Sequence, residues 1–127
     1  MLYLDTHVVV WLAAGLIDKL SHAAKIAIEE AEELVYSPVV ALELKYLHET
    51  GRIKQPPDRV LAGLEGSIGL KSRDLMLGPL IASASASRLE WTRDLFDRLI
   101  VAQSSYDGSS LITKDRKIRK HYSAAIW

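Results

Sequence analysis

The sequence predicts an α/β fold in which a central parallel β-sheet is flanked by helices on both faces. Short apolar runs alternate with longer segments of helical periodicity along the chain. Parallel strands need a long crossover between them, usually a helix, so this alternation is typical of a parallel sheet covered on both sides. The 127 residues contain no internal repeat and no linker rich in glycine or proline. We therefore expect a single domain over residues 1–127.

The first half of the chain is expected to pass twice from strand to helix. Ser21 and Ser37 are suitable N-caps, and Pro38 stands at the first helical position, which proline favours. Gly51 is a suitable residue to end the helix that follows. The expected elements are a strand over 2–4, a buried helix over 8–16, a helix from 22 to about 33, a strand over 34–36 and a helix from 38 through 47.

The second half follows the same alternation with less regular spacing. Pro56–Pro57 marks a break before the next helix, and Asp107–Gly108 is a turn pair. The pair Gly78–Pro79 is expected to disturb the first turn of its helix. The expected elements are helices over 58–65, 75–89 and 96–106, strands over 68–70 and 111–113, a basic helix over 116–122 and a last strand over 124–127.

The composition excludes several kinds of protein. Cysteine is absent, which rules out a disulfide scaffold, a thiolate zinc site, an iron–sulfur cluster and a cysteine nucleophile, and fits a reducing cytoplasm. No apolar stretch is long enough to span a membrane, and the segment Met1–Asp5 does not resemble a signal peptide. We therefore expect a cytoplasmic protein with no membrane partner.

The charge is balanced overall but not along the chain. Sixteen basic and sixteen acidic residues cancel, so no global field attracts nucleic acid. Residues 1–63 carry a net charge of −3, and residues 64–127 carry +3. A nucleic-acid partner would therefore depend on a local basic patch.

Four acidic residues far apart in sequence are expected to meet at one edge of the sheet. Asp5 follows the first strand directly, and Asp115 follows a later strand after one intervening residue. Glu43 is the only acid in an apolar helical run, and Asp97 lies in the first turn of a later helix. Since parallel strands end at a common edge, where α/β proteins collect their functional groups, these four acids are expected to converge there.

Such a cluster has two interpretations. Carboxylates held close together raise one another's pKa unless a cation neutralises them, and oxygen ligands favour Mg²⁺ or Mn²⁺. A cation of this kind activates water and stabilises the transition state of phosphodiester hydrolysis. Taken singly, each acid is more simply explained as a helix cap or a surface charge, and Glu43 as a partner of Lys45 or Arg98.

Four segments resemble, in order and in spacing, the motifs of the PIN-domain family, and specifically its VapC-like toxins. They are Leu4–Leu12 (LDTHVVVWL), Ser37–Leu44 (SPVVALEL), Arg93–Gln103 (RDLFDRLIVAQ) and Leu111–Asp115 (LITKD). Each motif alone is modest, but four in this order are specific. The resemblance covers essentially the whole chain and implies a PIN-like fold.

Carried over by position, the resemblance makes Asp5, Glu43, Asp97 and Asp115 the metal-binding and catalytic acids, with Mg²⁺ or Mn²⁺ as the cofactor. Asp94 matches an acid often present just before the aspartate of the third motif. It is therefore an alternative ligand or an accessory to the catalytic set.

Three neighbouring positions complete the comparison. Thr113 matches a hydroxyl position beside the last acid, where it would orient water or metal. Thr6 either supports the first acid or caps the next helix. Leu95 stands where many relatives have proline, which we interpret as a difference in the loop.

The resemblance implies a metal-dependent endoribonuclease, the toxin of a type II toxin–antitoxin pair, which cleaves RNA phosphodiesters with metal-activated water. Such proteins are usually homodimers, inhibited by a cognate antitoxin whose tail fills a groove and blocks the active site. The apolar segments 16–20 and 42–47 are candidates for these interfaces. The alternatives are a PIN nuclease of RNA processing without an antitoxin, and a catalytically silent PIN-fold binding module. The intact acids weigh against the silent module.

Basic residues near the acids have two possible roles. Five of the seven residues from 114 to 120 are basic, among them Lys114, Arg116 and Lys117. They either bind RNA phosphates at the mouth of the site or form a solvated helix face. Arg98 either contacts phosphate or pairs with a nearby acid, and the pair is the preferred interpretation.

Overall fold

The computed structural model describes the backbone of all 127 residues and every side chain except that of Ser87. At its centre, the described chain forms a parallel sheet of five strands in the order β3-β2-β1-β4-β5. The strands are β1 (Leu2–Leu4), β2 (Leu34–Tyr36), β3 (Lys71–Ser72), β4 (Ser110–Ile112) and β5 (Ala125–Ile126). The predicted parallel sheet is thereby confirmed.

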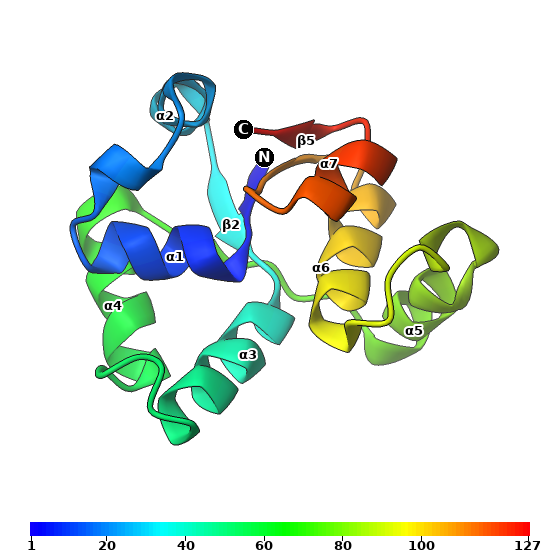
Figure 1. Cartoon of the computed structure of the whole chain (residues 1–127), viewed down its shortest axis with the longest axis horizontal. Helices are drawn as coiled ribbons and strands as arrows, with labels where there is room; N and C mark the ends of the chain where they lie inside the picture. The colour runs from blue at the N-terminus through cyan, green and yellow to red at the C-terminus, as the bar shows by residue number, and fades with distance from the viewer.

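Helices surround this sheet (Figure 1). They are α1 (Thr6–Ala13), α2 (His22–Glu30), α3 (Pro38–Glu49), α4 (Pro57–Ile68), α5 (Leu77–Ser85), α6 (Leu95–Tyr106) and α7 (Arg116–His121), with short 3₁₀ turns at Ile17–Lys19 and Ser87–Leu89. From β1 at the sheet centre, the chain moves to one edge through β2 and β3. It then returns to β4, on the other side of β1, and ends at the opposite edge with β5. Right-handed crossovers in opposite directions place helices on opposite faces. None of the helices in the described chain is long and apolar enough to cross a bilayer.

The element boundaries differ from the prediction where glycine ends a helix. α1 ends at Ala13, short of residue 16, and Gly15 just beyond it has a φ of 70°. The third strand does not occupy residues 68–70, because α4 continues to a left-handed Gly69 and the strand forms at Lys71–Ser72. A left-handed residue directly after a helix is a common stop signal, and glycine adopts that conformation without strain.

Two other helices are shorter than expected. α2 ends at Glu30 instead of residue 33, and α5 ends at Ser85 instead of residue 89. Pro79 lies within the first turn of α5 and does not break it. A proline is tolerated there because the first N–H groups of a helix have no intrahelical partner.

The two central strands are the most deeply buried part of the sheet. Tyr3 and Leu4 of β1, and Leu111 and Ile112 of β4, have no exposed surface. The chain leaves these neighbouring strands in opposite directions, so the space beyond their carboxyl ends is a topological switch point. Open α/β sheets bind their ligands at such points.

Buried side-chain hydrogen bonds fix α3 relative to α6. Ser37, the N-cap of α3, donates its hydroxyl to Oε1 of Gln103 on α6 at 2.5 Å. Nε2 of Gln103 donates to the carbonyl of Arg73, which follows β3. Both Ser37 and Gln103 are fully buried, and an unpaired polar group in such a place costs about 1–3 kcal/mol. The pair therefore sets the separation of the helices that carry Glu43 and Asp97.

Candidate active site

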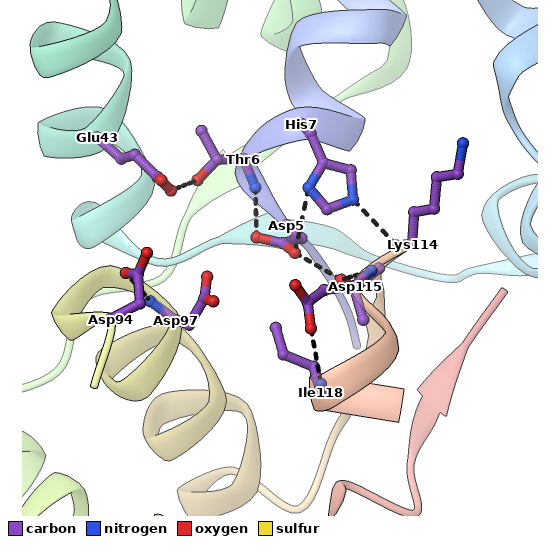
Figure 2. A network of polar contacts seen from close by, with 10 residues as sticks. Asp5, Thr6, His7, Glu43, Asp94, Asp97, Lys114, Asp115 and Ile118 are labelled. Carbon is purple, nitrogen blue, oxygen red and sulfur yellow. Dashed lines mark hydrogen bonds and ion pairs between the residues drawn. The ribbon is translucent and has the colours of Figure 1, made fainter. Parts of the chain in front are cut away.

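Asp5 lies at the centre of the candidate site, where β1 ends and α1 begins (Figure 2). The residue is only 2% exposed. Its Oδ1 accepts a hydrogen bond from the backbone N–H of Thr6 at 2.7 Å, so that the carboxylate caps α1. Its Oδ2 accepts a second bond from the Thr113 hydroxyl at 2.6 Å. The carboxylate is thus held in one orientation at a helix N-terminus, which favours negative charge.

Thr113 connects the acid after β1 with the acid after β4. It is fully buried, and its hydroxyl also accepts a hydrogen bond from the backbone N–H of Asp115 at 3.0 Å. Asp115 in turn caps α7, with Oδ1 accepting from the N–H of Ile118 at 2.8 Å. A hydroxyl can donate and accept at the same time, so one threonine fixes both aspartates.

Glu43 reaches the same region from α3. Its Oε1 accepts a hydrogen bond from the Thr6 hydroxyl. Burial raises the pKa of Glu43, the Thr6 hydroxyl lowers it, and the charges of Asp5 and Asp94 raise it again, so that the net direction is upward. Thr6 is therefore not the cap of α1, because Asp5 takes that position and Thr6 is the first helical residue. Its N–H donates to the carboxylate of Asp5, and its hydroxyl supports Glu43.

Asp94 and Asp97 stand at the start of α6 and have different surroundings. Asp94 is exposed and is the N-cap, with Oδ1 accepting from the N–H groups of Phe96 at 2.9 Å and Asp97 at 3.2 Å. Asp97 is partly buried, and Figure 2 shows its carboxylate turned toward the space beside Asp5. Of the two, Asp97 is the one that faces the other acids.

The acids surround a shared hollow space. Asp5, Glu43 and Asp97 line a hollow of about 320 Å³, the acid hollow, and Asp115 lines a shallower one of about 260 Å³. His7 lines both. Burial and the charges of the neighbouring acids raise the pKa of Asp97 from 3.8 to about 7. Among the described side chains, no group of three or more acids or histidines is placed so that it could hold a metal ion as the side chains stand. Asp5, Glu43 and Asp97 share one hollow, in which the charges of the surrounding carboxylates repel one another.

His7 belongs to this site, although its sequence position indicates only the start of a helix. Its Nδ1 lies 3.5 Å from Oδ2 of Asp5, and its Nε2 accepts from the backbone N–H of Lys114 at 3.0 Å. An accepting Nε2 leaves the hydrogen of the neutral ring on Nδ1, which faces the carboxylate. The only sequence signal for this role is the position of His7 two residues after Asp5.

Arg52 also lines the acid hollow and was not expected there. It lies in the loop between α3 and α4 and is the only arginine or lysine that lines this hollow among the described side chains. No motif in the sequence marks it, because loop residues reach the site only through the packing of the flanking helices.

The basic residues expected near the last acid are only partly directed at the site. The ammonium of Lys114 lies over the Trp11 ring, 5.6 Å from its centroid, and Figure 2 shows the side chain pointing away from the carboxylates. Arg116 and Lys117 are exposed in the first turn of α7. These three residues form a rim beside the acids without contacting them.

The preferred pairing of Arg98 with an acid is wrong. Within the part of the chain whose side chains are described, the buried Nε of Arg98 has no hydrogen-bond partner, and neither Asp94 nor Glu43 forms an ion pair with it. The two acids take other donors instead. Asp94 accepts from the backbone at the start of α6, and Glu43 accepts from Thr6.

Comparison with known proteins identifies the family. The chain matches the PIN domain family over residues 2–123. A curated relative, Ribonuclease VapC22 of Mycobacterium tuberculosis (strain ATCC 25618 / H37Rv), is 38% identical over 119 residues, which are 93% of this chain and 89% of the relative.

Solved structures show the same fold. A toxin–antitoxin complex from Klebsiella pneumoniae has a TM-score of 0.70 at 18% identity, and the match covers 100% of this chain and 97% of that chain. The structure of VapBC2 from Rickettsia felis, bound to a DNA fragment from its promoter, has a TM-score of 0.66 at 18% identity. This match covers 99% of this chain and 96% of that chain. With this likeness of fold and a family match over nearly its whole length, the chain belongs to the PIN domain family.

Proposed function

We propose that residues 1–127 act as one nuclease domain, a metal-dependent endoribonuclease that is the toxin of a toxin–antitoxin pair. The observation that carries this proposal is the convergence of Asp5, Glu43, Asp97 and Asp115 from separate elements on one edge of the sheet (Figure 2). Burial and the charges of the neighbouring acids raise the pKa of Asp97 to about 7, and a bound cation would relieve the repulsion between these charges. The relative at 38% identity is named a ribonuclease, which supports RNA as the substrate.

The donor set fits a hard divalent cation. Asp5, Asp97, Glu43 and Asp115 present only carboxylate oxygens, and the chain has no cysteine, so Mg²⁺ or Mn²⁺ is favoured over softer ions. Asp94 is engaged as the cap of α6, and we assign it an accessory role: it holds the first turn of the helix that carries Asp97, which asparagine can also do. When bound, the cation supplies charge neutralisation at the phosphate and makes water a better nucleophile.

The residues of this chain hold the acids in place before RNA binds. Thr113 orients Asp5 and Asp115, and the hydroxyl of Thr6 orients Glu43. Partners that fix ligating carboxylates reduce the reorganisation needed during the reaction. In this proposal no side chain forms a covalent bond with the RNA.

Cleavage of RNA should require Mg²⁺ or Mn²⁺. Purified protein freed of any partner should cut total RNA in the presence of either ion, lose this activity in EDTA and regain it when the metal is returned, as followed on a denaturing gel. Asp94→Asn is the matched control, because asparagine is an equally good N-cap and the variant should remain active. Cleavage that persists in EDTA would contradict the metal dependence. Failure of the folded protein to cut any RNA would favour the silent binding module.

We also propose that Lys114, Arg116 and Lys117 bind RNA phosphates at the rim, with Arg98 as a further contact. Replacing Arg116 and Lys117 together with alanine should lower the slope of log affinity against log salt by roughly 1–2, because each phosphate contact releases a counterion. Binding is measured on an inactive variant at several salt concentrations. A slope unchanged from that of the parent would assign both residues to a solvated face.

An antitoxin and a second copy of the chain are the proposed protein partners. The structural neighbours with this fold include toxin–antitoxin complexes, which supports the first. Large apolar side chains are exposed on several elements, and they include Leu16, Ile17, Leu42, Tyr46, Leu77, Ile81 and Leu95. Exposed apolar surface of this kind is typical of protein interfaces. Light scattering that gave a monomer mass at every concentration would contradict the homodimer.

A further inference from the structure

A second hollow adjoins the acid hollow and extends away from the carboxylates. It has a volume of about 280 Å³, and it shares three lining residues, Val10, Arg52 and Ile53, with the acid hollow. The shared residues place the two spaces side by side, so that neighbouring nucleotides of one strand can reach both. We refer to this second space as the apolar hollow.

The apolar hollow has the composition of a site for a flat, largely uncharged ring. Most of its lining residues are apolar, and it contains no acid among the residues described as lining it. The apolar lining consists of Val10, Ala13, Ala14, Ile53 and Val60. Its volume is nearly twice that of an apolar cavity of about 150 Å³ known to admit benzene, so one nucleobase can be accommodated.

Arg52 stands between the two hollows with a fixed backbone and a free side chain. Gly51, with a φ of 74°, reverses the chain after α3, and the N–H of Arg52 donates to the carbonyl of Leu47 at 2.8 Å. The side chain is exposed, and it forms no ion pair with any described side chain. Because no carboxylate occupies it, the guanidinium is available to bind a phosphate in a bidentate manner.

We propose that Arg52 binds the phosphate next to the one being cleaved, and that the apolar hollow receives the unpaired base of that nucleotide. This inference rests on the proposed ribonuclease function and names how the same site selects its RNA. The acids repel a polyanion, so a strand leaving the acid hollow is drawn to the guanidinium at its border. Beyond it, Lys54 adds a second positive charge, and the apolar walls accept an extruded base. RNA-binding proteins commonly recognise unpaired bases in this manner.

An apolar hollow can also receive a side chain of a protein partner, but the charge of its lining favours RNA. The hollow adjoins the acid hollow, where the proposed reaction places a phosphate, and its charged lining residues, Arg52 and Lys54, are both cationic. This complements a phosphodiester backbone.

The experiment uses two test variants, each with a matched control, and a short single-stranded RNA that the parent protein cleaves at a mapped position. Ala14→Phe fills the apolar hollow from the exposed end of α1, and Ala23→Phe places the same side chain at an exposed position of α2 that does not line the hollow. Arg52→Ala removes the proposed phosphate contact, and Arg88→Ala is a matched exposed arginine on another element. Each protein is given the RNA intact and as a series in which one base at a time is absent, and kcat/KM is measured with Mg²⁺.

The expected result has a positional signature. For the parent, loss of the base at one position beside the cut should lower kcat/KM by roughly five- to a hundredfold, the range that one stacked base contributes. For Ala14→Phe, kcat/KM on the intact RNA should be lower than that of the parent by a similar factor. The variant should cleave the RNA that lacks this base with the same kcat/KM as the intact RNA. Arg52→Ala should raise KM by about tenfold, the usual scale of a charge-assisted hydrogen bond, while Arg88→Ala and Ala23→Phe match the parent.

Three outcomes would overturn the proposal. One is a parent that tolerates every abasic position equally, and another is an Ala14→Phe variant that keeps the parent's positional penalty. The third is unaltered RNA cleavage by both variants together with lost binding of the partner protein, which would assign the hollow to that partner. If Ala14→Phe fails to fold, Gln55→Phe fills the same hollow from the opposite wall. A parent that cleaves no RNA at all would overturn the proposed function itself, which separates the two failures.

Discussion

Replacement of Asp97 by asparagine should lower metal-dependent RNA cleavage by at least about a hundredfold while the chain stays folded. The amide is nearly isosteric with the carboxylate, but it carries no charge and is a poorer ligand for a hard cation. Asp97 is the partly buried acid of α6 that faces Asp5, whereas Asp94 caps the helix. Initial rates on one RNA at saturating Mg²⁺ measure the effect, and Asp94→Asn provides the matched control.

The same substitution should stabilise the metal-free protein. Burial and the surrounding acids raise the pKa of Asp97 from 3.8 to about 7. The folded state therefore holds a proton that the unfolded chain has already released. The free energy of unfolding should fall as the pH rises from about 4 to about 7, by roughly 1–2 kcal/mol after allowance for screening by solvent. Asp97→Asn should remove this loss and unfold at a higher temperature at pH 8.

Two results would contradict this account of Asp97. Cleavage by Asp97→Asn at the parent's rate would exclude Asp97 as a ligand and make Asp94 the next candidate. A metal-free variant that is less stable than the parent at pH 8 would show that the carboxylate forms favourable contacts. In the parent, added Mg²⁺ should raise the melting temperature, because a ligand that binds only the folded state stabilises it by mass action.

Removing the hydroxyl of Thr113 should impair both stability and catalysis. Valine has the same shape, but Thr113→Val leaves Oδ2 of Asp5 without its donor and the N–H of Asp115 without its acceptor. Thr113 is fully buried and Asp5 is 2% exposed, so water cannot readily replace these bonds. The expected cost is about 1–3 kcal/mol in the free energy of unfolding. Loss of a partner that orients a metal-binding group should also reduce cleavage roughly ten- to a hundredfold.

Thr113→Ser is the control that separates orientation from packing. Serine keeps the hydroxyl and removes only a methyl group, so it should restore most of the activity even though it loses about 1 kcal/mol of stability. Denaturant unfolding and cleavage rates are measured on both variants. If Thr113→Ser were as inactive as Thr113→Val, the methyl group would be the important feature and the hydroxyl bridge would be refuted.

Local chemistry in the sequence determined the elements and much of the acid set. Ser21 and Ser37 were predicted as N-caps and are N-caps in the structure, with Pro38 at the start of α3. Their signals lie within a few residues of the backbone groups that they satisfy, so no tertiary information is needed. Asp5 and Asp115 could likewise be placed at one edge of the sheet, because parallel strands end together.

The third strand shows where local signals fail. The apolar residues 68–70 suggested a strand, but helix α4 uses residue 68 and stops at Gly69. The strand that pairs with β2 is Lys71–Ser72, which is exposed and has no apolar pattern. It is a strand because the edge of the sheet offers it backbone hydrogen bonds, and this information lies in β2 and not in the segment itself.

Only the tertiary structure decided which groups face the acids. The sequence places Asp94 and Asp97 three residues apart without showing that one caps the helix and the other turns into the hollow. His7 is held in the site by the backbone N–H of Lys114, which is distant in sequence. Arg52 lines the acid hollow together with Val10 of α1, which is also distant in sequence. Arg98 was expected to pair with Asp94 or Glu43, but these acids take other hydrogen-bond donors, one of them from a different helix. The physical reason is the same in each case: caps and strand ends depend on neighbouring residues in the chain, whereas side-chain partners and hollows depend on how the packed helices bring separate segments together.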